Sequence, residues 1–159
     1  MRIALGQINP TLGAFEANRR KIAEYVQRAY ERRCELAVFP EHALFGYLPN
    51  DLLERPSVVK EQLAQLSLLA KEIPKGISVL VGCVSMASSV GRRGLSEKYL
   101  YNSAALLERG TKTRFFHKQK LPTYDVFDEA RHCRPGLLSK NLVRIRGRKI
   151  LVTICEDIW

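Results

Sequence analysis

No stretch of the sequence is apolar over the roughly 20 residues that a membrane-spanning helix requires. The first eight residues also lack the long apolar core and the small-residue cleavage site of a secretory signal. Internal repeats and linkers are missing as well, so we expect the 159 residues to form one unit rather than two. From these absences we expect a cytoplasmic protein that does not bind membranes.

Cysteine pairs of the C-x-x-C type are absent too. The four cysteines are Cys34, Cys83, Cys133 and Cys155. The chain is too long for a small disulfide scaffold and has no secretory signal, so we expect reduced thiols. A metal cluster of His117, His132 and Cys133 would have a spacing that fits no zinc pattern, and we therefore expect no metal site.

Acidic residues are scarce relative to basic ones. The chain has 16 Asp and Glu against 26 Lys and Arg, which gives a formal charge of +10. Such an excess is typical of proteins that bind nucleic acid or another polyanion. The basic residues are, however, spread along the whole chain, and no basic run is interleaved with aromatics. We interpret them as solvated faces and expect no nucleic-acid partner.

Hydrophobic periodicity predicts an α/β fold, with a mixed sheet and flanking helices. Helices are expected at residues 15–33 and 56–73, and strands at 2–8, 36–39, 77–84, 100–108, 111–116, 142–146 and 150–154. The first strand is expected to be buried, the third to be central and the last to be the most buried. Residues 88–96 are expected to form a surface loop, and residues 118–140 a long irregular segment of the kind that often carries function.

The chain ends at Trp159, five residues after the last expected strand. No helix follows to cover that strand, which in an α/β sheet would leave an apolar face bare. We therefore expect residues 1–159 to be the front portion of a larger domain. Its active site would be incomplete, and the apolar side chains of the last strand would face solvent or another chain.

Three polar residues, Glu41, Lys118 and Cys155, each follow an expected strand. Catalytic groups of α/β sheets gather at the carboxyl ends of strands. Together, a thiol could attack an acyl carbon, a carboxylate could take its proton and an ammonium could stabilise the oxyanion. Each residue also has an ordinary interpretation, as a core cysteine, a turn-capping glutamate or a solvated lysine. Spacing alone leaves both interpretations open.

The residues around these three positions resemble the motifs of the nitrilase, or carbon–nitrogen hydrolase, superfamily. VFPEHALFGY at 38–47 is similar to its glutamate motif, HKQKLPTYDVFDE at 117–129 to its lysine motif and ICEDIW at 154–159 to its cysteine motif. Within this superfamily, the residues of the three motifs are most similar to those of the N-terminal glutaminase domain of glutamine-dependent NAD synthetases. The resemblance covers the whole chain. It implies the N-terminal part of a nitrilase-type α-β-β-α sandwich.

The same resemblance implies a role for each of the three residues. Cys155 would attack the side-chain amide of glutamine, Glu41 would act as the general base and Lys118 would stabilise the oxyanion. A γ-glutamyl thioester would form, and water would hydrolyse it. In the family register the catalytic lysine maps to Lys118 and not to Lys120.

Five further residues take supporting roles by this resemblance. Glu129 matches a second glutamate that places the lysine or the water, and the backbone N–H of Glu156 would join the oxyanion site. Tyr47, Tyr124 and Trp159 match positions that line the glutamine pocket.

Charge arguments add three expectations for the site. Lys118 should favour the thiolate of Cys155, and a sheltered Glu41 should have a raised pKa. The ammonium of Lys118 should lie within about 5 Å of a carboxylate oxygen of Glu41.

Cys133, with His132 before it, stands where the family usually has an aromatic pair, and we expect it to expose a thiol.

The resemblance also implies partners. Glutamine is the expected substrate, the glutaminase step should need no cofactor, and family members usually form homo-oligomers. ATP and Mg²⁺ would serve only a synthetase domain that accepts the ammonia, and no Ser-Gly-Gly-x-Asp-Ser loop of such a domain occurs here. Two alternatives stay open, namely a stand-alone amidase of the superfamily and an inactive fragment or interaction module.

Overall fold

The computed structural model describes residues 1–87 and 100–159, and its centre is one five-stranded sheet. In order across the sheet, the strands are β1 (Ile3–Leu5), β2 (Leu36–Val38), β3 (Ser78–Met86), β4 (Leu100–Leu107) and β5 (Arg114–His117). The strands β1, β2 and β3 run parallel, whereas β4 pairs antiparallel with both β3 and β5. The expected mixed sheet is therefore confirmed, with β3 at its centre.

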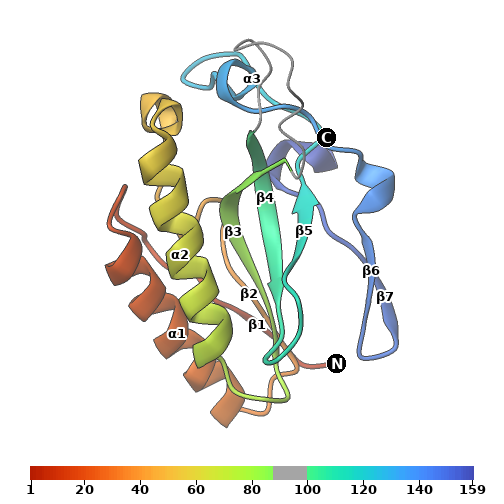
Figure 1. Cartoon of the computed structure of the whole chain (residues 1–159). Coiled ribbons are helices and arrows are strands. Elements are labelled where there is room, and N and C mark those ends of the chain that lie inside the picture. The colour runs from red at the N-terminus through yellow and green to blue at the C-terminus, as the bar shows by residue number, and fades with distance from the viewer. Residues whose placement is uncertain (88–99) are drawn as a thin grey trace.

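Two long helices cover one face of this sheet (Figure 1). Helices α1 (Phe15–Glu31) and α2 (Pro56–Glu72) each turn an apolar stripe towards it, as the periodicity predicts. Ile22 of α1 and Leu66 of α2 lie in one buried cluster with Val79 of β3. Burial of each such side chain contributes about 1.5–3 kcal/mol, which holds the helices against the sheet.

The opposite face of the sheet packs against a β-hairpin (Figure 1). Strands β6 (Leu142–Ile145) and β7 (Arg148–Leu151) form this hairpin as a separate two-stranded sheet. Ile145 lies in a buried cluster with Leu80 of β3. Successive residues of β3 thus serve two cores, because Val79 faces the helices and Leu80 faces the hairpin.

Short helical segments occupy the connections around the end of the sheet. They are the 3-10 helices Asn50–Glu54, Leu138–Lys140 and Cys155–Ile158 and the one-turn helix α3 (Glu129–His132). The segment 118–140 is therefore more regular than the sequence predicts. The expected surface loop 88–96 lies outside the described residues. No helix within residues 1–87 and 100–159 is both long and apolar enough to cross a bilayer.

Two strands differ from the sequence-based expectation. Only Ile3–Leu5 of the first expected strand forms β1, and this strand lies at the sheet edge, where Leu5 is 80% exposed. The strand expected at 150–154 forms instead as Arg148–Leu151, and it is not the most buried one, because β7 belongs to the hairpin and its Leu151 is 51% exposed. Apolar composition predicts burial, but it does not reveal which strands lie at an edge.

Candidate active site

The loop that carries Glu41 crosses closely over the central strand. It follows β2, and the N–H of Leu44 donates to the carbonyl of Gly82 on β3 at 3.0 Å. A Cβ atom at residue 82 would lie 2.2 Å from the Pro40 carbonyl oxygen and 2.5 Å from the His42 nitrogen. Only glycine permits this approach, which places Glu41 after the carboxyl end of β2.

Lys118 bridges two carboxylates at the end of β5. Its side chain is 1% exposed, and its Nζ lies 2.8 Å from Glu41 Oε1 and 2.7 Å from Glu129 Oε2. The first distance confirms the expected proximity of Lys118 to Glu41. Lys120, in contrast, is exposed and donates to the backbone carbonyl of Trp159.

Asn102 joins the same two carboxylates from β4. Its Nδ2 donates to Glu41 Oε1 at 2.6 Å and to Glu129 Oε1 at 2.8 Å, and the residue is 1% exposed. The sequence analysis missed Asn102. A lone amide within an apolar strand is the signal that could have found it, because a buried amide needs hydrogen-bond partners.

Cys155 begins a 3-10 helix after the hairpin, and it is the one exposed cysteine of the four. Its φ of 46° lies in the left-handed region, which is uncommon for a residue other than glycine. Cys34 and Cys83 are buried, as expected of core cysteines. The expectation that Cys133 exposes a thiol is wrong, because this residue packs into a buried cluster with Leu100.

Asp157 ties the Cys155 turn to the segment that follows β5. Its Oδ1 accepts hydrogen bonds from the backbone N–H groups of Gln119 and Lys120, both at 2.9 Å. Its Oδ2 accepts a third from the N–H of Ile154 at 3.1 Å. These charge-assisted bonds hold the Cys155 turn and the segment that contains Lys118 together. Asp157 is absent from the predicted site residues, although it lies within the cysteine motif.

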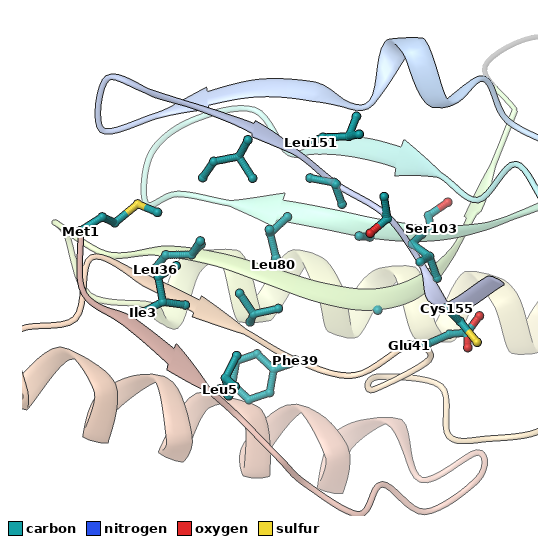
Figure 2. Close-up of a pocket in the computed structure, with 17 residues that line it drawn as sticks. Met1, Ile3, Leu5, Leu36, Phe39, Glu41, Leu80, Ser103, Leu151 and Cys155 are labelled. Atoms are coloured by element: carbon teal, nitrogen blue, oxygen red, sulfur yellow. The ribbon is translucent and has the colours of Figure 1, made fainter. Parts of the chain in front are cut away.

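A cleft of about 410 Å³ runs between the sheet and the hairpin and reaches Cys155 and Glu41. Figure 2 shows both residues at one end of this cleft. Its walls are mostly aliphatic, with Leu36 and Leu80 on the sheet and Leu151 on the hairpin. The thiol and the carboxylate therefore share one open volume that a small substrate can enter.

The three aromatic residues predicted to line the substrate pocket take different positions. Tyr47 lies beside His42, with ring centroids 6.0 Å apart, and burial together with nearby carboxylates raises the pKa of Tyr47 to about 12. Tyr124 is 56% exposed and donates its hydroxyl to Glu156 Oε2 at 3.0 Å, and this hydrogen bond raises the pKa of Tyr124. Trp159 is 81% exposed, and none of the three residues lines the cleft.

The pKa shifts of Cys155 and Glu41 differ in part from expectation. Burial raises the pKa of the Cys155 thiol, as does the charge of Glu41, and these effects outweigh the opposing influence of Lys118 and a backbone N–H. Burial also works to raise the pKa of Glu41, but the interactions with His42 and Lys118 hold it below its usual value. Lys118 does lower the pKa of the thiol, as expected, but burial and the charge of Glu41 outweigh it. The expectation of a raised pKa for Glu41 is wrong, because His42 and Lys118 outweigh burial there. At rest the site holds a thiol beside an ionised carboxylate, which suits general-base chemistry.

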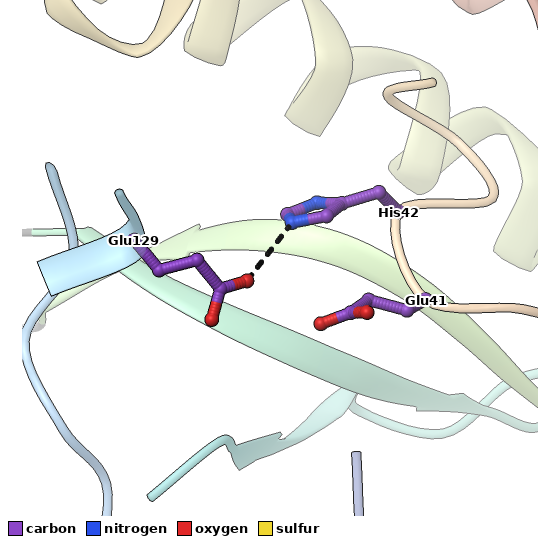
Figure 3. A group of neighbouring side chains, drawn as sticks. All are labelled: Glu41, His42 and Glu129. Atoms are coloured by element: carbon purple, nitrogen blue, oxygen red, sulfur yellow. Dashed lines mark ion pairs between the residues drawn. The ribbon is translucent and has the colours of Figure 1, made fainter. Parts of the chain in front are cut away.

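One side-chain oxygen or nitrogen atom from each of Glu41, His42 and Glu129 lies within 4.8 Å of the other two, a spacing that could hold a metal ion (Figure 3). His42 Nε2 lies 4.0 Å from Glu129 Oε1, and burial lowers the pKa of His42 to about 4, so the imidazole is neutral at neutral pH. Burial raises the pKa of Glu129, although the hydrogen bond from Lys118 opposes this. The ammonium of Lys118 already pairs with both carboxylates, and a metal ion would have to displace it. A second such group consists of Asp51, Glu54 and His132.

Comparison with known proteins identifies the family. The profile of the carbon-nitrogen hydrolases matches residues 2–159. The chain belongs to the carbon–nitrogen hydrolase family. Its relatives include the glutamine-dependent NAD(+) synthetases of Synechocystis sp., 45% identical over 157 residues, and of Thermotoga maritima, 40% identical over 162 residues. These matches cover 99% and 100% of this chain but 28% and 26% of the relatives, so the chain spans little more than a quarter of their length.

Solved structures agree with this assignment of the carbon–nitrogen hydrolase domain. The glutamine-dependent NAD+ synthetase from Acinetobacter baumannii, in complex with ADP, matches with a TM-score of 0.78 and 34% identity over 99% of this chain and 28% of that one. An amidase from Nesterenkonia sp. matches with a TM-score of 0.78 and 22% identity over 99% of this chain and 56% of that one, which speaks for the fold alone. The expected nitrilase-type architecture is thus confirmed.

In this carbon–nitrogen hydrolase domain, iodoacetamide should modify Cys155 and leave the other three cysteines unmodified while the chain is folded. The others are buried, and burial raises the pKa of Cys83 to about 12. Because only the thiolate reacts and the pKa of Cys155 is raised, the rate should still increase with pH above 9.0, the ordinary thiol value. Peptide mapping by mass spectrometry checks both points, with Cys155→Ser as the control. Preferential labelling of Cys83 would contradict the assignment.

Proposed function

We propose that this domain hydrolyses the side-chain amide of glutamine and supplies the ammonia for NAD synthesis from deamido-NAD. One arrangement carries the proposal: an exposed Cys155 thiol shares a cleft with Glu41, and a buried Lys118 holds Glu41 at 2.8 Å. The relatives that match this chain at 45% and 40% identity are named glutamine-dependent NAD(+) synthetases. Their name supports glutamine as the amide and an ammonia-accepting synthetase domain as the partner.

In the first step the sulfur of Cys155 attacks the amide carbon, and Glu41 accepts the thiol proton. The oxyanion that forms needs preorganised donors. An ammonium has three N–H bonds. Lys118 donates one to Glu41 and forms an ion pair with Glu129, which leaves an N–H bond for the oxyanion. The backbone N–H of Glu156, which acts to lower the pKa of the Cys155 thiol, is the second donor.

In the second step the carbon–nitrogen bond breaks. Glu41 returns the proton to the leaving nitrogen, ammonia departs, and a γ-glutamyl thioester remains on Cys155. Water then adds to the thioester carbonyl as Glu41 takes its proton. The carbon–sulfur bond breaks, glutamate leaves, and the proton returns to sulfur. This cycle needs no cofactor, and ATP with Mg²⁺ would act only in the synthetase domain.

The remaining predicted residues take supporting roles in this proposal. Glu129 keeps Lys118 in place through its 2.7 Å ion pair. Tyr47, Tyr124 and Trp159 are all exposed outside the cleft, and each would have to turn towards it to contact glutamine at the rim.

The proposal is tested by incubating the chain with glutamine and searching for the γ-glutamyl thioester on Cys155 by mass spectrometry. We expect the adduct in the unaltered chain and none in Cys155→Ala. Steady turnover should stay below about 1 s⁻¹, because the short Cys155 turn and the open cleft do not hold the reacting groups rigidly. Absence of the adduct with a fully folded chain would refute the proposal. Turnover at an ordinary enzymatic rate by a monomer would refute the expectation that residues 1–159 form an incomplete active site. The mass in solution also tests whether the chain forms the expected homo-oligomer.

The aliphatic walls of the cleft favour a second candidate, an amidase for small apolar amides. Propionamide serves as the discriminating substrate in the same thioester assay. Faster acylation of Cys155 by propionamide than by glutamine would favour this candidate. Acylation by neither amide would favour an inactive fragment or interaction module.

A further inference from the structure

We propose that Asn102 is a positioning residue that makes Glu41, rather than Glu129, the base of the site. This role rests on the proposed glutaminase function. No motif named in the sequence analysis contains Asn102. Its importance follows from the hydrogen bonds of its amide group.

Four hydrogen bonds and ion pairs form a closed ring around the two carboxylates. Lys118 Nζ lies 2.8 Å from Glu41 Oε1 and 2.7 Å from Glu129 Oε2. Asn102 Nδ2 lies 2.6 Å from Glu41 Oε1 and 2.8 Å from Glu129 Oε1. Both donors therefore meet on a single oxygen of Glu41, whereas they engage both oxygens of Glu129.

This unequal sharing leaves one oxygen of Glu41 for chemistry. Among the residues that the structure describes, none donates a hydrogen bond to Glu41 Oε2. Glu41 also lines the cleft that contains Cys155, whereas Glu129 does not. The free oxygen of Glu41 is thus the one that can take a proton from the thiol.

The orientation of the Asn102 amide is determined by charge. A rotated amide would direct its Oδ1 at two carboxylate oxygens, which is repulsive. In the observed orientation Oδ1 is buried and has no hydrogen-bond partner within residues 1–87 and 100–159. The fold therefore leaves one acceptor unpaired while both N–H groups are directed at the carboxylates.

Neutral donors matter here because two carboxylates share one ammonium. The titratable groups that influence Glu41 or are influenced by it are His42 on its own loop, Lys118 after β5, Glu129 on α3, Tyr47 beside His42, and Cys155 at the cleft end. His42 is neutral at neutral pH, so Lys118 is the only one of these that then carries positive charge. A hydrogen bond to the ionised form lowers the pKa of a carboxyl group. Loss of the Asn102 donors should therefore raise the pKa of Glu41.

The test is a titration of Glu41 in the folded 159-residue chain, with glutamate labelled at its side-chain carboxyl carbon and followed by ¹³C NMR. Glu41→Gln assigns the signal. In Asn102→Leu, which keeps the branched side-chain skeleton and removes both donors, the Glu41 titration should move upward by about one to two pH units, as expected for one charge-assisted hydrogen bond. In Asn102→Ala, the second variant, it should move in the same direction.

Asn18→Leu is the matched control. Asn18 is also 1% exposed, and its Nδ2 also donates to two oxygens, but these are the backbone carbonyls of Thr11 and Leu44. It should lower the melting temperature without moving the Glu41 titration. An unchanged titration in either folded Asn102 variant, or an equal shift in Asn18→Leu, would overturn the inference. The readout does not depend on glutamine hydrolysis, so failure of the proposed function appears separately, as absence of the thioester in the unaltered chain.

Discussion

Replacement of Lys118 by alanine should slow formation of the γ-glutamyl thioester by about 10²–10³-fold, the usual consequence of removing one oxyanion donor. The side chain is 1% exposed and pairs with Glu41 and Glu129. Its removal leaves two sheltered carboxylates without a counter-charge, so the variant should also lose on the order of 3–5 kcal/mol of stability unless one of them takes up a proton. The rate is measured by quenching at fixed times and quantifying the adduct on Cys155.

Lys120→Ala is the matched control, because it removes a lysine two residues away that is exposed and donates to the carbonyl of Trp159. It should be nearly silent in the acylation assay and in a thermal melt. The reverse pattern, with a silent Lys118→Ala and an inactive Lys120→Ala, would show that the lysine motif has been placed in the wrong register.

Glu41→Gln should slow acylation of Cys155 by about 10²–10⁴-fold, the range that general-base catalysis contributes. The raised pKa of Cys155 means that the resting sulfur is protonated, so a base is required for attack. Because the pKa of Glu41 is lowered, the unaltered chain should keep its acylation rate as the pH falls from 7 towards the ordinary glutamate value of 4.5 and lose it only below that value. The acylation rate of Glu41→Gln should not show this loss at low pH.

Glu16→Gln serves as the control for this substitution. Glu16 is an exposed residue of α1 that pairs with Arg20, remote in sequence from the three motifs. It should leave both the rate and its pH profile unchanged. If Glu41→Gln acylated Cys155 at the unaltered rate, a different base would have to be sought, and Glu129 would be the first candidate.

Local sequence patterns determined the regular elements and the chemical identity of the site. The helices expected at 15–33 and 56–73 form as Phe15–Glu31 and Pro56–Glu72. Both have an apolar stripe and the second begins with a proline, and these signals are local because each depends only on residues within the helix. The order of the strands along the chain and the placement of Glu41, Lys118 and Cys155 after strands also follow from the sequence. The meeting of Lys118 with Glu41 was predictable because both follow strands of one sheet.

Partners from distant parts of the chain were not predictable in this way. Asn102 and Glu41 are 61 positions apart, and neither residue's own segment indicates the hydrogen bond between them. Asp157 accepts hydrogen bonds from backbone N–H groups that lie 37 and 38 positions before it in the chain. Every residue except proline has such a group, so no residue type indicates the contact. Such contacts depend on how the strands pair and not on any local pattern.

The sequence by itself determined the family motifs, the α/β class and the residues able to do the chemistry. Only the tertiary structure decided that Leu5 and Leu151 are exposed, that Cys133 is buried, and that Cys155 rests as a thiol beside an ionised Glu41. The physical reason is the same in each case. Burial and pKa depend on the summed surroundings of a group, and these surroundings come from segments that are distant along the chain.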